Sequence, residues 1–209
     1  MYVAFILDVY AQRIVAWHTQ TTRTVDLVLR PLQIALWERD RTGRPIKAGQ
    51  LIAHSDAGSQ YTALAWCEKL ELDGIAPSIG SVGDAYDNAL MESINGVYKT
   101  ECIRTTVFHD GPYKTIADVE FATAGWVDWY NHRRLHGSLG MIPPAEFEEI
   151  YYAAPPGVVQ HLRAAENLGR FGHAKTVPQH RSSRSGGSRN HRPEHPDSRQ
   201  TLYPSDHVS

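Results

Sequence analysis

The chain opens with two short apolar runs separated by only five residues. Residues 2–7 (YVAFIL) and 13–19 (RIVAWHT) are rich in β-branched and aromatic side chains, and DVYAQ lies between them. Two runs of this composition so close together predict antiparallel strands joined as a β-hairpin. The fold therefore has to accommodate a sheet that begins with the first residues of the chain.

Helix-like and strand-like patterns alternate after the hairpin. Residues 24–43 (TVDLVLRPLQIALWERDRTG) have the apolar spacing of a helix, and Pro31 inside this segment predicts a kink or two shorter helices. The segments 49–56 (GQLIAHSD) and 75–80 (IAPSIG) are typical of short buried strands. Between them a helix is expected over 62–74, with its final glycine as the C-cap.

Helical patterns dominate the next part of the chain. A Gly/Ser-rich loop leads into a long helix expected over 84–102, a second helix is expected over 115–134, and a third, with proline in its first turn, over 143–153. Two hairpin strands, a helix, and then strands alternating with helices predict an α/β fold with a mixed sheet.

Composition excludes several classes of protein. No run of about 18 apolar residues exists, so no membrane-spanning helix is expected. The N-terminus lacks the features of a signal peptide. The two cysteines, Cys67 and Cys102, form no CxxC pair, which favours a reducing compartment and argues against a structural zinc site. These features predict a cytoplasmic protein.

Charge and composition divide the chain in two. The net charge is -2, yet residues 153–209 contain eight Lys and Arg against four Asp and Glu, so the preceding part is acidic. An acidic core counts against nucleic acid as a partner, unless some carboxylates hold metal ions. Beyond about Ala154 the sequence is rich in Ser, Arg, His and Pro, which predicts a folded domain over 1–153 and a disordered tail over 154–209.

Two carboxylates stand out as candidates for chemistry. Asp56 ends an expected strand, where open α/β sheets place their ligands, and Gly58 leaves its carboxylate accessible. Glu92 lies inside an expected helix among apolar residues, and Lys99 follows two turns later on the same face. Taken singly, Asp56 is typical of a turn residue and Glu92 of a solvated helix acid. As a pair, such hard oxygen ligands could hold two Mg²⁺ ions for phosphoryl transfer.

Four stretches together resemble a known family. HSDAGSQYT and DNALMESINGVYKTE place Asp56 and Glu92 with 35 residues between them, as in the integrase/transposase catalytic core. FILDVYAQRIVAWHT resembles the hairpin of that core, and WYNHRRLHGSLGMIPPAEF resembles its C-terminal signature. The resemblance covers residues 1–152 and is closest to the second reading-frame product of IS3-type insertion sequences.

The resemblance implies a fold, a cofactor and site residues. It implies a ribonuclease H-like sheet flanked by helices, with an Asp-Asp-Glu triad that binds two Mg²⁺ or Mn²⁺ ions. Carried over, Asp56 is the second acid and Glu92 the third, and both are catalytic residues and metal ligands. DNA-binding roles are implied for Lys99 and for residues of the YNHRRLHGSLG signature. The signature residues are Tyr130, Asn131, Arg133, Arg134 and His136, of which Arg133, Arg134 and His136 are the DNA-binding candidates.

The sequence departs from the family at its beginning. In the family the first acid lies on a strand just before the hairpin with which this sequence begins. We therefore expect this chain to be truncated at its N-terminus, and the central strand, between the hairpin and the strand ending at Asp56, to be missing from it. Asp8 aligns outside the triad and is expected to be a turn residue. Unpaired strand edges and an incomplete triad predict an unstable chain and a poor catalyst.

Three functions remain as hypotheses. The first is a transposase core that hydrolyses DNA at the ends of a mobile element and transfers the freed strand to target DNA. It would act as a homo-oligomer on DNA, together with the first reading-frame product of the same element. The second is a non-catalytic remnant that binds DNA or assembles with full-length transposase. The third is a ribonuclease H-like nuclease that cuts without joining.

Overall fold

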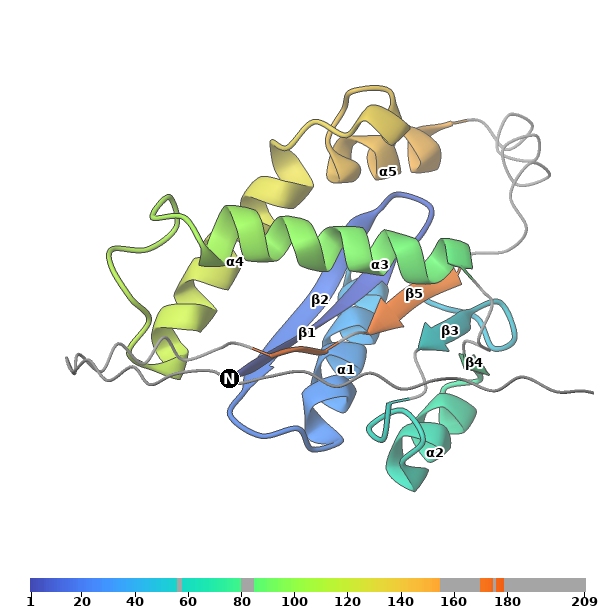
Figure 1. Cartoon of the computed structure of the whole chain (residues 1–209). Coiled ribbons are helices and arrows are strands. Elements are labelled where there is room, and N and C mark those ends of the chain that lie inside the picture. Colours follow the sequence, from blue (N-terminus) through green and yellow to red (C-terminus); the bar gives the residue numbers. More distant parts are fainter. Residues whose placement is uncertain (56–57, 80–84, 155–169, 175, 179–209) are drawn as a thin grey trace, which may run out of the picture.

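The computed structural model describes residues 1–55, 58–79, 85–154, 170–174 and 176–178. A single sheet lies at its centre, with the strand order β2-β1-β5-β3-β4 and with β6 paired to β1 (Figure 1). The strands are β1 (Tyr2–Asp8), β2 (Arg13–Gln20), β3 (Ile52–Ser55), β4 (Ala76–Ile79), β5 (Arg170–Ala174) and β6 (Thr176–Pro178). The hairpin β1–β2 is antiparallel and β3–β4 is parallel, so the sheet is mixed, as predicted.

Helices cover both faces of this sheet, which explains why β1 reads as a continuous apolar run. Val3, Phe5 and Leu7 belong to the buried cluster on one face, whereas Ala4 and Ile6 belong to the cluster on the other. Alternate side chains of a strand point to opposite faces, so a strand covered on both sides needs apolar residues throughout.

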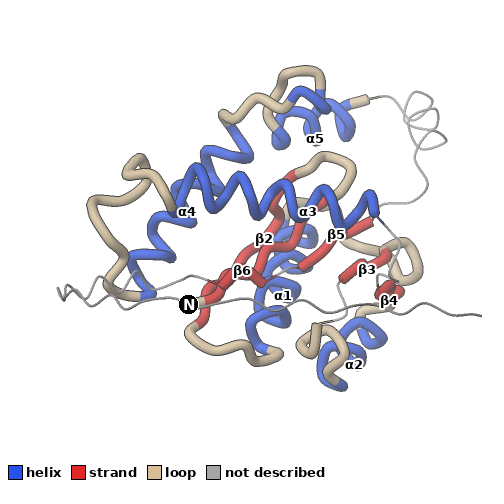
Figure 2. Tube along the Cα trace, viewed as in Figure 1, coloured by secondary structure: helices blue, strands red, loops and turns tan. Residues whose placement is uncertain are grey.

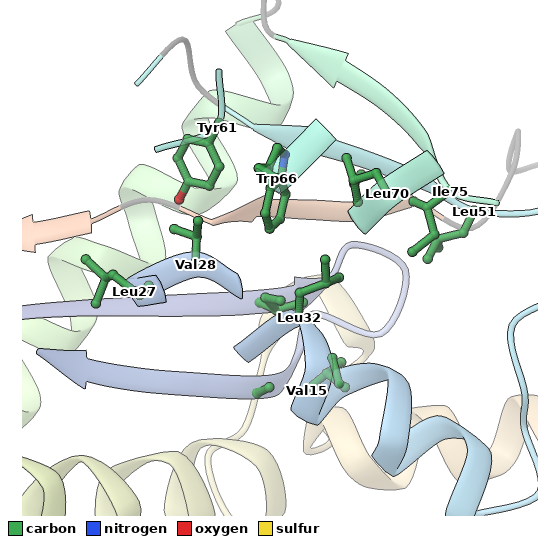
Figure 3. Packing of buried hydrophobic residues seen from close by; sticks show 14 residues of the cluster. Val15, Leu27, Val28, Leu32, Leu51, Tyr61, Trp66, Leu70 and Ile75 are labelled. Atoms are coloured by element: carbon green, nitrogen blue, oxygen red, sulfur yellow. The ribbon is translucent and has the colours of Figure 1, made fainter. Parts of the chain in front are cut away.

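One face is covered by α1 (Asp26–Arg41) and α2 (Leu64–Leu72). Figure 3 shows Tyr61, Trp66 and Leu70 directed towards Val28 and Leu32 of α1. In this cluster the rings of Tyr61 and Trp66 meet edge to face, with centroids 5.4 Å apart. Burial of this apolar stripe also explains why α1 is one helix rather than the two shorter ones considered from sequence. Pro31 is itself buried in the stripe.

The other face is covered by α3 (Ala85–Tyr98) and α4 (Ile116–His132) (Figure 2). Phe5, Tyr98 and Trp126 form the centre of this cluster, where the ring of Tyr98 lies 5.0 Å from each of the other two. A π-helical turn, Lys99–Ile103, continues α3, so the helix expected over 84–102 is present but changes its hydrogen-bonding pattern near its end. A capping box between Thr115 and Asp118 starts α4.

The last helix, α5 (Pro144–Ala153), packs against the turn of the hairpin. The ring of Tyr10 lies 5.2 Å from that of Phe147 and 4.9 Å from that of Tyr151. Between α2 and β4, Gly74 has the predicted capping role: its φ is +65°, and the amide of Ile75 donates to the carbonyl of Leu70 at 2.8 Å. A Cβ at Gly74 would lie 2.5 Å from the Cβ of Ala48, so the position requires glycine.

The centre of the sheet differs from the sequence-based expectation. We expected an empty position between the hairpin and β3, because the strand that fills it in the family was missing. In the structure β5 occupies that position, and it comes from the segment predicted to be a disordered tail. Apart from Ala154, β5 and β6, the predicted tail lies outside the described residues. Within the described part of the chain, no helix is long and apolar enough to cross a membrane.

Candidate functional site

The strand β3 leads directly to the first candidate residue. β3 ends at Ser55, which is buried, and the ring of His54 is joined through Nδ1 to Ser78 Oγ of β4 at 2.9 Å. Asp56 itself lies outside the described residues. After it, the amide of Tyr61 donates to the carbonyl of Gly58 at 2.9 Å, and Tyr61 is buried in the cluster beneath α1. The chain is thus anchored on both sides of Asp56.

Glu92 lies on the outward side of α3. Its neighbours Met91 and Ile94 are buried against the sheet, whereas Glu92 is exposed. The helix that carries it packs over β5, which lies beside β3 in the sheet (Figure 1). Glu92 therefore occupies the position expected of a solvent-facing helix acid, on an element that covers the strand adjacent to β3.

Two buried amide side chains near these acids were not anticipated. Gln60 follows Asp56 by four residues and Asn95 lies one turn after Glu92, and both are more than nine-tenths buried. In the part of the chain that the structure describes, neither the nitrogen nor the oxygen of the Gln60 amide forms a hydrogen bond. The Oδ1 atom of Asn95 has no hydrogen-bond partner there either. Buried polar groups are normally satisfied, so each of these two side chains has an incomplete set of interactions. The sequence signal for Asn95 was a polar residue between Ile94 and Val97, at an apolar position of the helix.

Lys99 begins the π-helical turn and is half-buried. The carbonyl of Lys99 accepts from the amide of Arg104 at 3.0 Å, which closes the turn. Single π-helical turns are frequent at functional sites, and this one was not predicted from the sequence.

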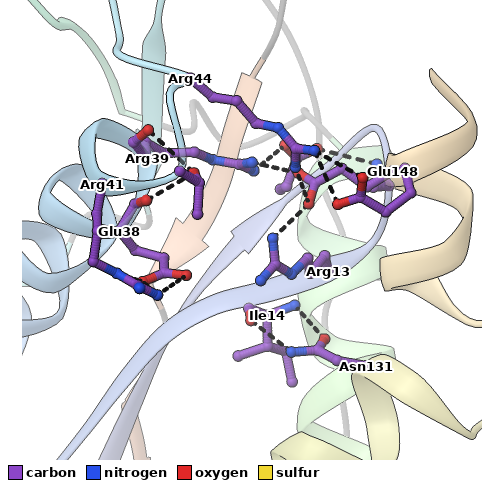
Figure 4. Close-up of polar contacts among 12 residues, drawn as sticks. Arg13, Ile14, Glu38, Arg39, Arg41, Arg44, Asn131 and Glu148 are labelled. Carbon is purple, nitrogen blue, oxygen red and sulfur yellow. Dashed lines mark hydrogen bonds and ion pairs between the residues drawn. The ribbon is translucent and has the colours of Figure 1, made fainter. Parts of the chain in front are cut away.

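The signature segment places a clamp on the edge strand. Asn131 is buried at the end of α4, where its Oδ1 accepts from the amide of Ile14 at 3.0 Å and its Nδ2 donates to the carbonyl of Ile14 at 2.9 Å (Figure 4). Tyr130 is part of the core, and the ring of His136 packs edge to face on it, with centroids 4.7 Å apart. Burial lowers the pKa of His136, and the positive charge of Arg134 lowers it further.

The two arginines of the signature have different surroundings. Arg133 is exposed and pairs with exposed Asp128 at 3.2 Å. Arg134 is about three-quarters buried and donates from Nε to Glu101 of the π-helical turn at 3.2 Å. Glu101 also accepts from the indole of Trp126 at 3.2 Å, so Arg134 ties the signature to the end of α3. DNA binding by Lys99, Arg133, Arg134 and His136 stays a prediction.

A buried ion cluster joins three elements that the sequence did not connect. Arg39 of α1, Arg13 of β2 and Arg44 all pair with Glu148 of α5 (Figure 4). Burial alone would raise the pKa of Glu148, but the charges of Arg39 and Arg13 outweigh it and hold that pKa below its usual value.

Asp8 also belongs to this ion cluster. Its Oδ1 accepts from the amides of Tyr10 and Ala11 at 2.9 and 3.0 Å, and its Oδ2 pairs with Arg39 at 2.9 Å. The prediction that Asp8 is a turn residue is confirmed. Burial raises its pKa, although Arg39 opposes the shift.

No metal site is evident in the described ranges. Among those residues, no group of three or more His, Cys, Asp or Glu side chains could hold a metal ion. This finding does not include Asp56. The described part of the predicted site therefore offers one accessible carboxylate, Glu92, on an element beside β3.

Comparison with known families gives two overlapping matches. Two models, both described as integrase core domain, match residues 1–85 and 73–144. Together they extend from Met1, just before β1, to Pro144, the first residue of α5.

Individual relatives come from bacterial insertion sequences. A protein of insertion sequence element IS986/IS6110 from Mycobacterium tuberculosis is 48% identical over 152 residues, which are 73% of this chain and 53% of that protein. The transposase for IS629 from Shigella sonnei is 47% identical over 74% of this chain and 48% of its own length. Transposase InsF for IS3A from Escherichia coli is 29% identical, over 71% and 48% respectively. The chain thus spans about half the length of the curated relatives it matches.

A solved structure supports the fold. The chain resembles one in the simian T-cell lymphotropic virus intasome in complex with PP2A regulatory subunit B56 gamma. The TM-score is 0.55 and the identity 15%, over 74% of this chain and 49% of that one. The fold is ribonuclease H-like, as the sequence resemblance implied.

Proposed function

Because this chain belongs to the integrase core family found in insertion-sequence transposases, we propose that it forms the catalytic core of a DNA transposase. It would break phosphodiester bonds at the ends of a mobile element and join the freed strands to target DNA. Asp56 and Glu92 are the proposed catalytic residues. Since the chain spans about half the length of its relatives, the activity of a whole transposase is part of the proposal.

The main observation that supports this proposal is the arrangement of β3 in the sheet and of α3 over the neighbouring strand. β3 ends immediately before Asp56, at the carboxyl edge of a parallel pair of strands, where α/β sheets bind ligands. Glu92 is directed outward from α3, the helix over the neighbouring strand, while the residues beside it anchor that helix. A carboxylate on a rigid helix needs no reorganisation before it binds a cation.

The chemistry of the donors fits Mg²⁺ or Mn²⁺. Both ions prefer carboxylate oxygens, and two such ions would activate the attacking oxygen and stabilise the leaving one. Asp56 and Glu92 would hold them, and the unsatisfied amides of Gln60 and Asn95 are near in sequence. Two carboxylates bind divalent ions less tightly than three, so weak binding is expected.

Lys99 and Arg133 are the proposed phosphate contacts. Arg133 is exposed and, among the described residues, pairs with the exposed carboxylate of Asp128, a weak interaction that DNA phosphate can replace. We propose that Arg134 and His136 support the segment that carries Arg133, because Arg134 forms an ion pair with Glu101 and the ring of His136 packs on Tyr130. The proposed partners are DNA, further copies of the chain on that DNA, and the first reading-frame product of the element.

Metal binding separates this proposal from a role without catalysis. Mn²⁺ titration of the purified chain, followed by electron paramagnetic resonance, should show affinity that falls at least tenfold in Glu92→Gln. The matched control is Glu68→Gln, which changes an exposed glutamate on α2, on the other face of the sheet. Equal affinity in the two variants would remove Glu92 from the site.

Activity on labelled element-end oligonucleotides tests the reaction itself. Joined products with Mg²⁺ or Mn²⁺ that disappear in Glu92→Gln would support the transposase core, whereas cut products without joining would indicate a nuclease. The second candidate, a non-catalytic remnant that binds DNA, is favoured by the ion pair between Asp8 and Arg39, which engages Asp8 and keeps its carboxylate from serving as a further metal ligand. DNA binding with neither cutting nor metal affinity would establish that role.

A further inference from the structure

The strand β5 connects two halves of the sheet. Among the described strands, β1 pairs with β2, β5 and β6, whereas β3 pairs with β4 and β5. Without β5, the hairpin and the β3–β4 pair would share no backbone hydrogen bond. A strand that follows all the described helices in the sequence therefore completes the centre of the sheet (Figure 1).

The strand β5 runs in a defined direction relative to its two neighbours. β5 runs antiparallel to β1, with Leu7 opposite Gly172 and Asp8 opposite Phe171. It runs parallel to β3, with Ile52 opposite Arg170. A segment inserted in the reverse direction would have to exchange these two patterns of hydrogen bonds, whose geometries differ. In the structure the position holds a strand in this orientation.

The pairing continues along the rest of β1. β6 follows in the same direction, with Ala4 opposite Thr176 and Tyr2 opposite Pro178. Residues 170–174 and 176–178 therefore pair with both ends of β1. Proline cannot donate a backbone hydrogen bond, and Pro178 lies at the end of the ribbon, where that loss costs least.

The surroundings favour occupation by an extended backbone. Val3, Ala4 and Phe5 of β1 are fully buried, and α3 packs over β5. An empty position would leave the backbone groups of β1 and β3 unpaired beside two hydrophobic clusters, which is costly. Exposed strand edges of this kind bind peptides by adding a strand.

We infer that the space between β1 and β3 is a strand-binding site, which β5 of the same chain occupies, while β6 extends the pairing along β1. This inference does not depend on the proposed catalysis. Ala154, the last described residue after α5, and Arg170 are only 16 positions apart in the sequence. A tether of this length gives an effective concentration in the millimolar range, so a strand too short to bind as a free peptide can bind in its own chain.

Hydrogen exchange of the full chain tests the occupancy. Amides of 170–178 and of β1 should exchange slowly, and Gly172→Pro should speed exchange in β1 and β3 at least tenfold. The matched control is Gly186→Pro, beyond the paired segment, which should leave the pattern unchanged. Loss of cooperative unfolding in Gly172→Pro alone would also support the inference. Fast exchange of 170–178 in the unmodified chain, or equal effects of the two prolines, would overturn it.

A disulfide cross-link tests whether the strand belongs to the same molecule. Directly opposed residues of antiparallel strands have Cα atoms about 4.5–5.5 Å apart, which a disulfide can span. In a Cys67→Ser background, Ala4→Cys with Thr176→Cys should oxidise rapidly to a cross-linked monomer. Ala4→Cys with Ser185→Cys is the mismatched control. Cross-linked dimers, which indicate exchange of the strand between copies, or oxidation no faster than in the control, would contradict the inference.

Discussion

Asn131 binds the main chain of Ile14 with both ends of its amide, at 3.0 Å to the nitrogen and 2.9 Å to the oxygen. The side chain at the end of α4 thus pairs with β2, the strand at the edge of the sheet, as a neighbouring strand would. It satisfies two buried backbone groups and fixes the signature segment against the hairpin. Asn131 therefore supports the fold of a motif that the sequence analysis associated with DNA.

Replacement of Asn131 by alanine should be strongly destabilising. The variant leaves the amide and the carbonyl of Ile14 unpaired, and each unpaired buried group costs about 1–3 kcal/mol. We expect the free energy of unfolding in urea to fall by about 2–4 kcal/mol. His132→Ala, at the next and exposed position, should change it by less than about 0.5 kcal/mol. Similar values for the two variants would show that the clamp contributes little.

The ion cluster around Glu148 gives a second test of stability. Glu148→Gln would leave Arg39, whose side chain is 5% exposed, without its main partner. Removing one member of a buried pair costs about 3–5 kcal/mol, because the remaining charge stays buried. Glu149→Gln removes an exposed carboxylate that also pairs with Arg44, and it should cost less than about 1 kcal/mol. Thermal unfolding of the two variants provides the comparison.

The lowered pKa of His136 predicts how the free energy of unfolding depends on pH below neutrality. Its pKa in the fold is lowered from 6.5, so between 6.5 and the folded value the unfolded chain binds more protons. The free energy of unfolding should therefore fall as pH is lowered through this range. Burial, followed by the charge of Arg30, lowers the pKa of His18 as well, which adds a slope of the same sign.

Urea unfolding at pH 7.5 and 5.5 measures this dependence. His136→Gln should remove part of the slope, which cannot exceed about 1.4 kcal/mol per pH unit for one group. His18→Gln should remove another part, and the double variant should be flattest. An unchanged slope in His136→Gln would mean that its protonation is not coupled to folding, despite the neighbouring charges of Arg134 and Glu101.

The layers of the fold could be predicted from local patterns, whereas its long-range pairings could not. The runs at 2–7 and 13–19 gave the hairpin, and the glycine that ends α2 gave its cap, because these features depend on adjacent residues. The Arg39–Glu148 pair joins residues far apart in the sequence, and no local pattern encodes it. β5 was missed because its sequence, RFGHA, has little strand propensity of its own, and its pairing comes from the edges of β1 and β3.

The predicted site was only partly accessible to sequence reasoning. Asp56 and Glu92 were predicted from motif spacing, and the structure adds the outward direction of Glu92. The different surroundings of Arg133 and Arg134 depend on Glu101 in the π-helical turn, which sequence could not reveal. Adjacent arginines in one motif thus have distinct environments.

That difference predicts distinct effects on DNA binding. Arg133→Ala should weaken binding to duplex DNA and make the dependence of log K on log salt shallower by about one, because one phosphate contact is lost. Its thermal stability should be unchanged, since its partner Asp128 is exposed. Arg134→Ala should instead lower the melting temperature, because partly buried Glu101 loses its charged partner. Arg41→Ala, an exposed arginine of α1 on the opposite face of the sheet, is the control for charge alone. If Arg41→Ala and Arg133→Ala reduced affinity and salt dependence equally, DNA binding would reflect net charge rather than a surface built around Arg133.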